Sequence, residues 1–292
     1  MKSNRRASWK EWFVTSPSLF WLSFFFVIPT LLVFAIAFKP ANPYGGIGKG
    51  WSLQTLFHLA NPNYPSILWR TLWISLLTTV ICLVLAVPTG YHIARLKPRV
   101  RQLVLLLVIV PFWTSFLVRI FAWKLLLHPE GFVKRALVMV GLAGPESILM
   151  YNSAAVLLVM VYTYLPFSIL PIYAAAEKYD FRLSEAARDL GAGAVRTFFS
   201  VFLPAIRRGI LTSVLVVFIP ALGSYVIPDI VGGPGSEMMG NKIAQRVFVD
   251  RNLPHAAALS ALLILAVMAP LVMVLLLQRN RVKNDPFISE DS

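Results

Sequence analysis

Charged side chains are scarce in this sequence of 292 residues: they make up 14% of the chain, and only 13 of them are acidic. A soluble domain of this length usually carries about 25% charged residues. Hydrophobic residues account for 58% of the sequence and form repeated long runs. The shortage of charge and the apolar runs together exclude an ordinary soluble protein and indicate an integral membrane protein.

Cysteine and the common signatures of catalysis are also scarce or absent. The single cysteine, Cys82, lies in an apolar run; it can form no internal disulfide and is expected to be a small buried hydrophobic side chain. No phosphate loop of the G-x-x-x-x-G-K-[ST] type occurs, because residues 48–50 lack both its spacing and its hydroxyl residue. No cluster of histidine, aspartate and glutamate suggests a metal site or acid–base chemistry. We therefore expect no catalytic residue, metal or cofactor on this chain itself.

Basic residues outnumber acidic ones and give a formal net charge of +14. Such a balance can indicate nucleic-acid binding, but a nucleic-acid-binding protein gathers its lysines and arginines on one face or in one domain. Here they stand in short clusters between apolar runs. We therefore expect contacts with membrane lipid and none with nucleic acid.

Six apolar segments are long enough to cross a hydrocarbon core of ~30 Å, which needs about 20 helical residues. They cover residues 19–38, 67–94, 103–127, 154–175, 209–230 and 256–278. The first has a basic start, as a signal peptide does, but its apolar run exceeds the usual length of about 7–15 residues, so we expect a retained helix. The sequence thus predicts an all-α polytopic membrane protein with six transmembrane helices.

Most of the 27 lysines and arginines lie in four regions that a six-span arrangement places on one side of the membrane. The positive-inside rule makes this side cytoplasmic, so both termini are expected inside the cell. The predicted division is a cytoplasmic arm over 1–18, a membrane domain over 19–278 and a cytoplasmic tail over 279–292. The basic residues are Lys2, Arg5, Arg6 and Lys10; Arg95, Lys97, Arg99 and Arg101; Lys178, Arg182, Arg188, Arg196, Arg207 and Arg208; and Arg279, Arg281 and Lys283.

The cytoplasmic connection over residues 180–204 predicts two short helices joined by glycines. Asp180 can be the N-cap of the first helix and Gly191 its left-handed C-terminal residue, and Pro204 is expected to end the second. Such a pair can form a knob whose apolar face lies in a groove of a partner, or a connector that rests on its own membrane surface. The apolar positions are Leu183, Ala187 and Leu190 in the first helix, and Val195, Phe198, Phe199 and Phe202 in the second.

The spacing in this connection carries a resemblance to a known family. Glu185-Ala186-Ala187 is followed by Gly191, then by Val201 and by Leu203-Pro204. This pattern resembles the signature loop of the membrane-spanning subunits of binding-protein-dependent ABC importers, with Val201 where isoleucine is the commoner residue. The resemblance implies the type I ABC importer permease fold.

The resemblance also implies a role for the loop and a set of partners. Glu185, Ala186, Ala187, Gly191, Leu203 and Pro204 are expected to couple the pore to an ATPase, with Glu185 as a polar anchor and the alanines allowing close approach. The partners implied are a dimer of ATPase subunits that bind ATP and Mg, a second related permease chain and a periplasmic solute-binding protein. The location implied is the inner (cytoplasmic) membrane.

Three further stretches narrow the resemblance to spermidine/putrescine permeases. They are residues 111–119, 218–233 and 250–254, with the small residues that follow. The substrate this implies is a polyamine. Ser224 stands where those permeases often have an acidic residue, and relatives of the same architecture carry phosphonates, opines or iron chelates, so these solutes are the alternatives.

A polyamine needs aromatic faces, hydroxyl groups or carboxylates in place of its water. Candidates for such a path are Trp113, Tyr162, Tyr164, Tyr225 and Asp229, although packing between helices or anchoring at an interface is the commoner role of such aromatic residues. Arg119 and Lys124 are expected to pair with Asp229 or to reach the outer surface. A secondary transporter that needs no ATPase is the rival class, but the spans lack the ionisable relay or inverted halves it requires.

Overall fold

The computed structural model describes residues 9–141, 144 and 146–283, and within these ranges the regular structure is helical. Ala41 and Ile47 form an isolated antiparallel β-bridge. The chain divides into two compact units, one formed by residues 1–64 and 242–292 and the other by residues 65–241.

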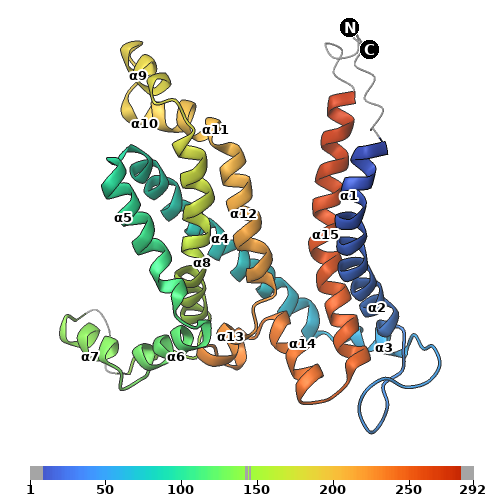
Figure 1. The fold of residues 1–292 in the computed structure, drawn as a ribbon. Coiled ribbons are helices and arrows are strands. Elements are labelled where there is room, and N and C mark those ends of the chain that lie inside the picture. Colours follow the sequence, from blue (N-terminus) through green and yellow to red (C-terminus); the bar gives the residue numbers. More distant parts are fainter. Residues whose placement is uncertain (1–8, 142–143, 145, 284–292) are drawn as a thin grey trace. The chain divides into compact units, whose positions relative to one another are not determined.

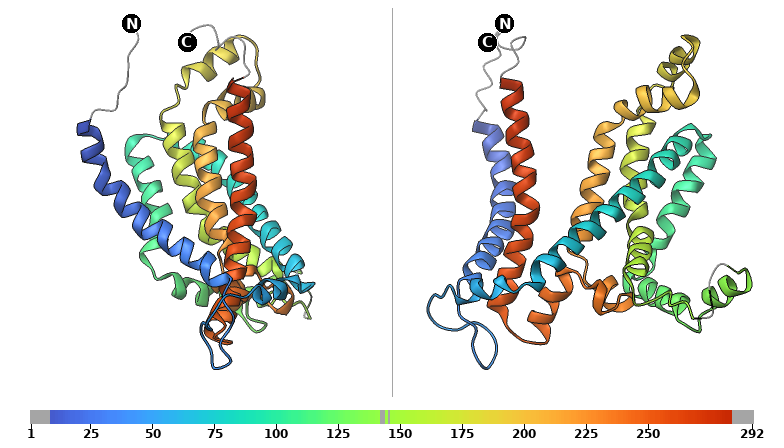
Figure 2. Two further views of the ribbon diagram at one scale, coloured as in Figure 1. Left: turned by 90° about the vertical axis from the view of Figure 1, so that its right-hand side faces the viewer. Right: turned by 180° about the vertical axis from the view of Figure 1, so that it is seen from behind.

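In the first unit, two long helical segments pack against each other at one end and diverge towards the other (Figures 1 and 2). One is continuous through α1 (Trp9–Leu22), a π-helical turn η1 (Ser23–Val27) and α2 (Ile28–Ala37), and the other is α15 (Leu253–Lys283). Their contact includes small residues, because Ala37, Ala257 and Ala258 are all buried in one cluster. Short helices α3 (Gln54–Phe57) and η2 (His58–Ala60) lie in the loop that follows α2.

The second unit is a bundle whose long helices are α4 (Asn63–Arg95), α5 (Pro98–Ile109), α8 (Ser153–Glu177) and α12 (Arg207–Leu222). At one end of the bundle lie the short helices α9 and α10, and at the other lie α6, α7 and α13 (Figure 1). The shorter elements are η3 (Val110–Trp113), α6 (Phe116–Leu127), α7 (Phe132–Met139), α9 (Arg182–Asp189), α10 (Ala194–Thr197), η4 (Phe198–Phe202), α11 (Leu203–Ala205), α13 (Val226–Val231) and η5 (Pro234–Ser236). Helix α14 (Met239–Phe248) begins in this unit but falls mostly in the first, which resumes at Lys242.

The bundle is held by close contacts of α8 with α4 and α12. A Cβ atom on Gly209 of α12 would lie 2.5 Å from Cβ of Ala175, and one on Gly90 of α4 would lie 2.8 Å from a methyl group of Ile172. Small residues at such positions let helix backbones approach closely, which is how membrane helices gain packing energy. The Ser168 and Ser213 hydroxyl oxygens, 2.6 Å apart, add a buried hydrogen bond between α8 and α12.

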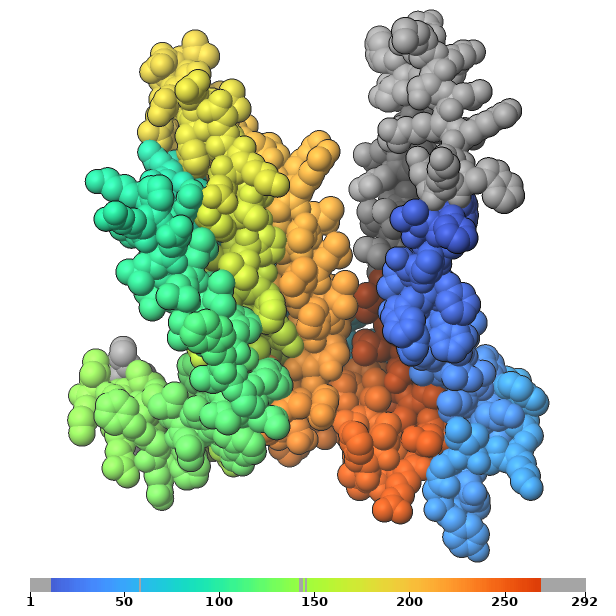
Figure 3. Space-filling model, in the orientation of Figure 1, coloured from blue at the N-terminus to red at the C-terminus, as the bar shows by residue number. Residues whose placement is uncertain are grey.

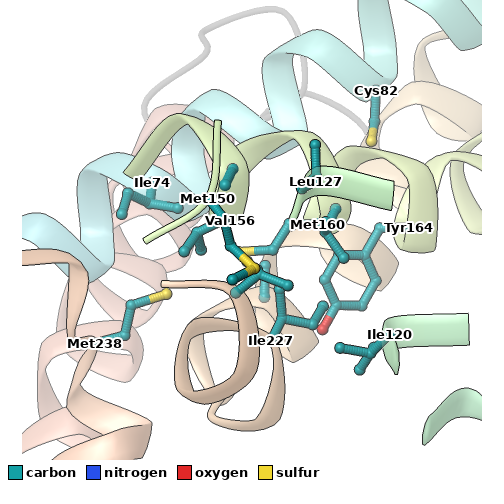
Figure 4. Close-up of a cluster of buried hydrophobic side chains, with 14 of the residues drawn as sticks. Ile74, Cys82, Ile120, Leu127, Met150, Val156, Met160, Tyr164, Ile227 and Met238 are labelled. Atoms are coloured by element: carbon teal, nitrogen blue, oxygen red, sulfur yellow. The ribbon is translucent and has the colours of Figure 1, made fainter. Parts of the chain in front are cut away.

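A core of buried apolar side chains fills the end of the bundle away from α9 (Figure 4). Met150, Val156 and Met160 are fully buried, and Ile120 and Ile227 reach the same cluster from α6 and α13. The core therefore fixes α6 and α13 against α8.

Three helical segments are long and apolar enough to cross a membrane: residues 12–37, 63–95 and 153–177. They agree with the first, second and fourth predicted spans. Two bent helix pairs bring the number to five if each pair is one span. The sixth predicted span, 256–278, lies within α15, a continuous helix of 31 residues that begins with the apolar stretch 253–268.

The third predicted span, 103–127, is wrong as a single helix. The chain breaks at Thr114 and Ser115, and the two halves meet at 89°. Pro111 begins the distortion, and the Thr114 hydroxyl donates a hydrogen bond of 2.7 Å to the Pro111 carbonyl oxygen. A side chain that bonds a backbone carbonyl in this way competes with the helix for that acceptor.

The fifth predicted span, 209–230, is also too long. Helix α12 ends at Leu222, and α13 starts separately at Val226. Pro228 explains the break, because in a continuous helix its ring would clash with the carbonyl group of Ser224.

The close approach at Gly209 gives a test of the bundle. We expect Gly209→Leu to lower the free energy of unfolding by about 1–3 kcal/mol, because a larger side chain must push α12 away from α8. Thermal unfolding of the purified protein in detergent measures this. Gly235→Leu is the matched control, since nothing lies within 4 Å of a Cβ atom there; equal melting temperatures for the two variants would contradict the packing described.

Candidate functional site: the 180–204 loop

The first helix of the loop, α9, begins one residue later than the sequence predicts. Phe181 occupies the N-cap position, and Asp180 instead accepts a hydrogen bond from the backbone N–H of Arg182 at 3.0 Å. Asp180 therefore makes the turn into the helix without capping it. The predicted end is confirmed: Gly191 has φ +87°, a left-handed conformation that favours glycine.

The second helix is longer than predicted and contains a π-helical turn. It runs from α10 through η4 into α11, so that Pro204 lies inside it and not at its end. In η4 the N–H of Leu203 donates to the carbonyl of Phe198, a five-residue step that shifts the hydrogen-bond register just before the proline. The chain bends at Ile206 instead, and the helices on either side of that residue meet at 72°.

An aromatic cluster holds the loop on the bundle. The Tyr91 ring of α4 lies 4.7 Å from Phe202, 5.4 Å from Phe198 and 5.8 Å from Phe181, measured between ring centroids. Tyr179, just after α8, lies 5.2 Å from both Phe181 and Phe202. The contacts are mostly edge-to-face, the geometry that aromatic rings prefer.

This cluster corrects the prediction that one apolar face of the second helix is offered to a partner. Phe202 is fully buried and Phe198 is half-buried, so both serve the loop's own attachment. Val195 and Phe199 are exposed, as are Leu183 and Leu190 of the first helix; Leu190 is 90% exposed. The outer surface of the loop therefore carries exposed apolar side chains, but only four of the seven predicted positions contribute to it.

Charged side chains of the same loop are also exposed, namely Arg182, Glu185, Arg188, Asp189 and Arg196. Glu185 and Ala186 are exposed on α9 and Ala187 is half-buried, while Leu203 is half-buried and Pro204 is exposed on α11. The coupling residues proposed from the sequence thus lie on both short helices of one protruding segment, at the end of the bundle (Figure 3). Glu185 and Ala186 are open to a binding partner, whereas Leu203 is part of the inner support.

Several residues that support the loop were missed by sequence reasoning. Tyr179 and Ser184 hydroxyl oxygens lie 2.7 Å apart in a buried hydrogen bond, which ties α9 to the end of α8. Arg95 donates a hydrogen bond to the Tyr91 hydroxyl, with an N···O distance of 3.1 Å. Arg101 forms an ion pair with Glu177 at 3.0 Å. The sequence feature that could have indicated these supporting residues is the group of tyrosines and arginines where α4 and α8 end.

The proposed path residues do not form one cluster. Trp113 is 76% exposed beside the break after α5, and the Tyr162 ring packs against Trp123 at 5.2 Å. Tyr164 is buried and donates a hydrogen bond to the Pro220 carbonyl at 3.3 Å, so its hydroxyl group joins α8 to α12. Tyr225 and Asp229 are exposed near the start of α13.

Arg119 takes a partner that was not predicted. Its guanidinium group lies over the Phe112 ring, 5.0 Å from the centroid, and the ion pairs seen in the described part of the chain do not include it. Within the same part of the chain, no three His, Cys, Asp or Glu side chains are grouped closely enough to hold a metal ion.

Comparison with known proteins places these features in one family. Residues 86–282 match the family described as "Binding-protein-dependent transport system inner membrane component". The spermidine/putrescine transport system permease protein PotB of Haemophilus influenzae is 37% identical over 240 residues, which are 82% of this chain and 84% of that protein. PotB of Escherichia coli is 35% identical over 240 residues, 82% of this chain and 87% of that protein.

The fold also resembles that of two solved transporter structures. A chain of the bacterial alginate ABC transporter, in complex with its alginate pentasaccharide-bound periplasmic protein, superposes with a TM-score of 0.66 at 17% identity and covers 96% of both chains. A second structure of an alginate-importing ABC transporter gives a TM-score of 0.62 at 14% identity, covering 96% of this chain and 99% of that one. The chain belongs to the family of inner-membrane permease components of binding-protein-dependent ABC transport systems, and it is a non-catalytic, membrane-spanning subunit of such a system.

Proposed function

We propose that this chain is one of two pore-forming subunits of an ATP-driven importer of polyamines such as spermidine and putrescine. The observation that carries the substrate class is the identity of 34–37% over 82% of the chain to several spermidine/putrescine permeases. Because the sequence similarity extends over most of the chain, a shared transport role is the simplest interpretation. The alternative solutes are phosphonates, opines and iron chelates.

The loop over residues 180–204 is the proposed joint with the ATPase. Glu185 and Ala186 are exposed, and so are the apolar side chains of Leu190 and Val195 in the same loop. An exposed pair of short helices with an apolar centre and a charged rim has the composition of a protein–protein contact. The aromatic cluster attaches the loop to α4 and to the end of α8. A movement of the ATPase that displaces the loop therefore displaces these helices as well.

The proposed topology has six spans with both termini in the cytoplasm. Its arm covers residues 1–18, its permease domain 19–278 and its tail 279–292. The bent segments around Thr114 and Ile206 are consistent with this topology if each bent pair contains one crossing. The cytoplasmic side is then the one that carries the loop and the arginines beside it.

The complete transporter then contains a second, related permease chain, two ATPase subunits that hold ATP and Mg, and a periplasmic solute-binding protein. ATP binding closes the ATPase dimer, and the loop transmits this movement to the bundle and opens the path outward. Substrate released by the binding protein enters, and hydrolysis restores the inward-facing state. Trp113, Tyr162, Tyr164, Tyr225 and Asp229 remain the residues proposed to line the path, with the exposed ring of Trp113 and carboxylate of Asp229 best placed to meet a cation.

Reversal of charge at the joint should uncouple the two subunits. We expect Glu185→Lys to reduce uptake more than about tenfold, because loss of a hot-spot residue from an interface costs about 2 kcal/mol or more. Uptake of labelled spermidine by cells and the amount of ATPase recovered with the tagged chain are the measurements.

The matched control is Glu130→Lys, which makes the same charge change at an exposed site in the turn after α6. This control should keep both the ATPase and its membrane level. Wild-type uptake by Glu185→Lys at normal expression would rule out the coupling role of this residue.

The substrate class is tested by deleting the gene in cells without a second polyamine importer. We expect uptake of labelled putrescine and spermidine to fall to background and to return when the wild-type chain is supplied. Normal uptake in the deletion strain would exclude polyamines as the substrate while leaving the ABC permease assignment in place.

A further inference from the structure

We propose that Tyr91 and Arg95, at the cytoplasmic end of α4, are positioning residues that make α4 follow the movement of the 180–204 loop. This inference rests on the proposed coupling function and names a route by which the loop acts on the bundle. The route is an aromatic contact between two segments far apart in the sequence.

Tyr91 is the ring in the cluster that comes from another span. Tyr179 and Phe181 directly follow α8, so their contacts with the loop are local. Tyr91 reaches across from α4 and touches both helices of the loop, through Phe181 before α9 and through Phe198 and Phe202 in η4. Any displacement of the loop relative to α4 must therefore break these ring contacts or carry Tyr91 along.

Arg95 fixes the orientation of the Tyr91 ring. It lies one helical turn further along α4, where its guanidinium group donates to the Tyr91 hydroxyl at 3.1 Å. The same group lies 5.8 Å from the centroid of the Phe181 ring, within the range of a cation–π contact. Arg95 thus joins α4 to the residue that begins α9, and a planar guanidinium group does this in a way that lysine cannot.

The contact has the stiffness that transmission needs. Phe202 is fully buried, and packed side chains of this kind pass on a displacement because they leave no space to absorb it. One residue before Tyr91, Gly90 brings the α4 backbone against α8 so closely that a Cβ atom would lie 3.1 Å from the backbone nitrogen of Tyr173. The partly exposed ion pair between Arg101 and Glu177 joins α5 to α8 and does not tie α4 to the loop. The ring contacts of Tyr91 therefore tie α4 to the loop.

The test compares ATP hydrolysis with transport in the complete transporter. The complex of this chain with its ATPase is purified and placed in vesicles with spermidine-loaded binding protein, and spermidine uptake is measured per ATP hydrolysed. We expect Tyr91→Leu to keep the ATPase bound but to lower uptake per ATP roughly tenfold, a typical size for coupling between two sites. Tyr91→Phe keeps the ring contacts and loses only the hydrogen bond from Arg95, so it should lower uptake per ATP by less than Tyr91→Leu does.

Two further variants separate positioning from folding. Arg95→Gln leaves all the rings in place and should lower uptake per ATP by less than Tyr91→Leu does. Arg95→Lys keeps the positive charge but should show the same reduction as Arg95→Gln, because lysine lacks the planar guanidinium group. Phe167→Leu removes an aromatic ring of α8 that packs on Phe112 at 4.7 Å, away from the loop, and should keep the wild-type ratio.

The outcomes distinguish this inference from the coupling proposal itself. An unchanged uptake per ATP in Tyr91→Leu and Arg95→Gln would overturn the inference. Loss of the ATPase from the Tyr91→Leu complex would also overturn it, because Tyr91 would then serve docking and not transmission. Wild-type behaviour of Glu185→Lys in the same vesicles would instead show that the loop has no coupling role.

Discussion

The packing of Tyr91 against Phe198 and Phe202 is the interaction on which the functional account depends. A loop made of two short helices has too few residues to be stable alone, because an isolated helix of this length is marginal in water. It acquires a fixed position by burying Phe202 and half-burying Phe198 against α4 and the end of α8, and by the buried hydrogen bond between Tyr179 and Ser184. That attachment turns its outer face, with Glu185 and Ala186, into a defined surface.

The long helices of the second unit are also held together by close packing. α8 is held to α4 and α12 by contacts at Gly90 and Gly209 that leave no room for a side chain. Such contacts favour movement of the three helices as a group over sliding of one past another. The breaks at Thr114 and Ile206 are the places where the helical hydrogen bonds are already interrupted and where the chain can change direction.

Much of this organisation could be predicted from the sequence, and the failures have physical causes. Long apolar runs and basic clusters place the helices, and Gly191 marks the end of α9 because only its left-handed backbone allows the turn. Sequence periodicity could not tell that Phe202 faces inward, since the inner and outer faces of an amphipathic helix depend on a partner far away in the chain. It also could not place the break at Thr114, where a side-chain hydrogen bond to Pro111 replaces a helical one. Tyr91 was missed because its role arises only when α4 and the loop meet.

The central claim is that the exposed face of α9 contacts the ATPase. A photo-crosslinking amino acid in place of Ala186, activated in intact membranes, tests it most directly, because Ala186 is exposed and small. The account predicts a covalent product with the ATPase subunit whose yield changes when ATP is added. Crosslinking of Ala186 to lipid or to this chain alone would contradict it.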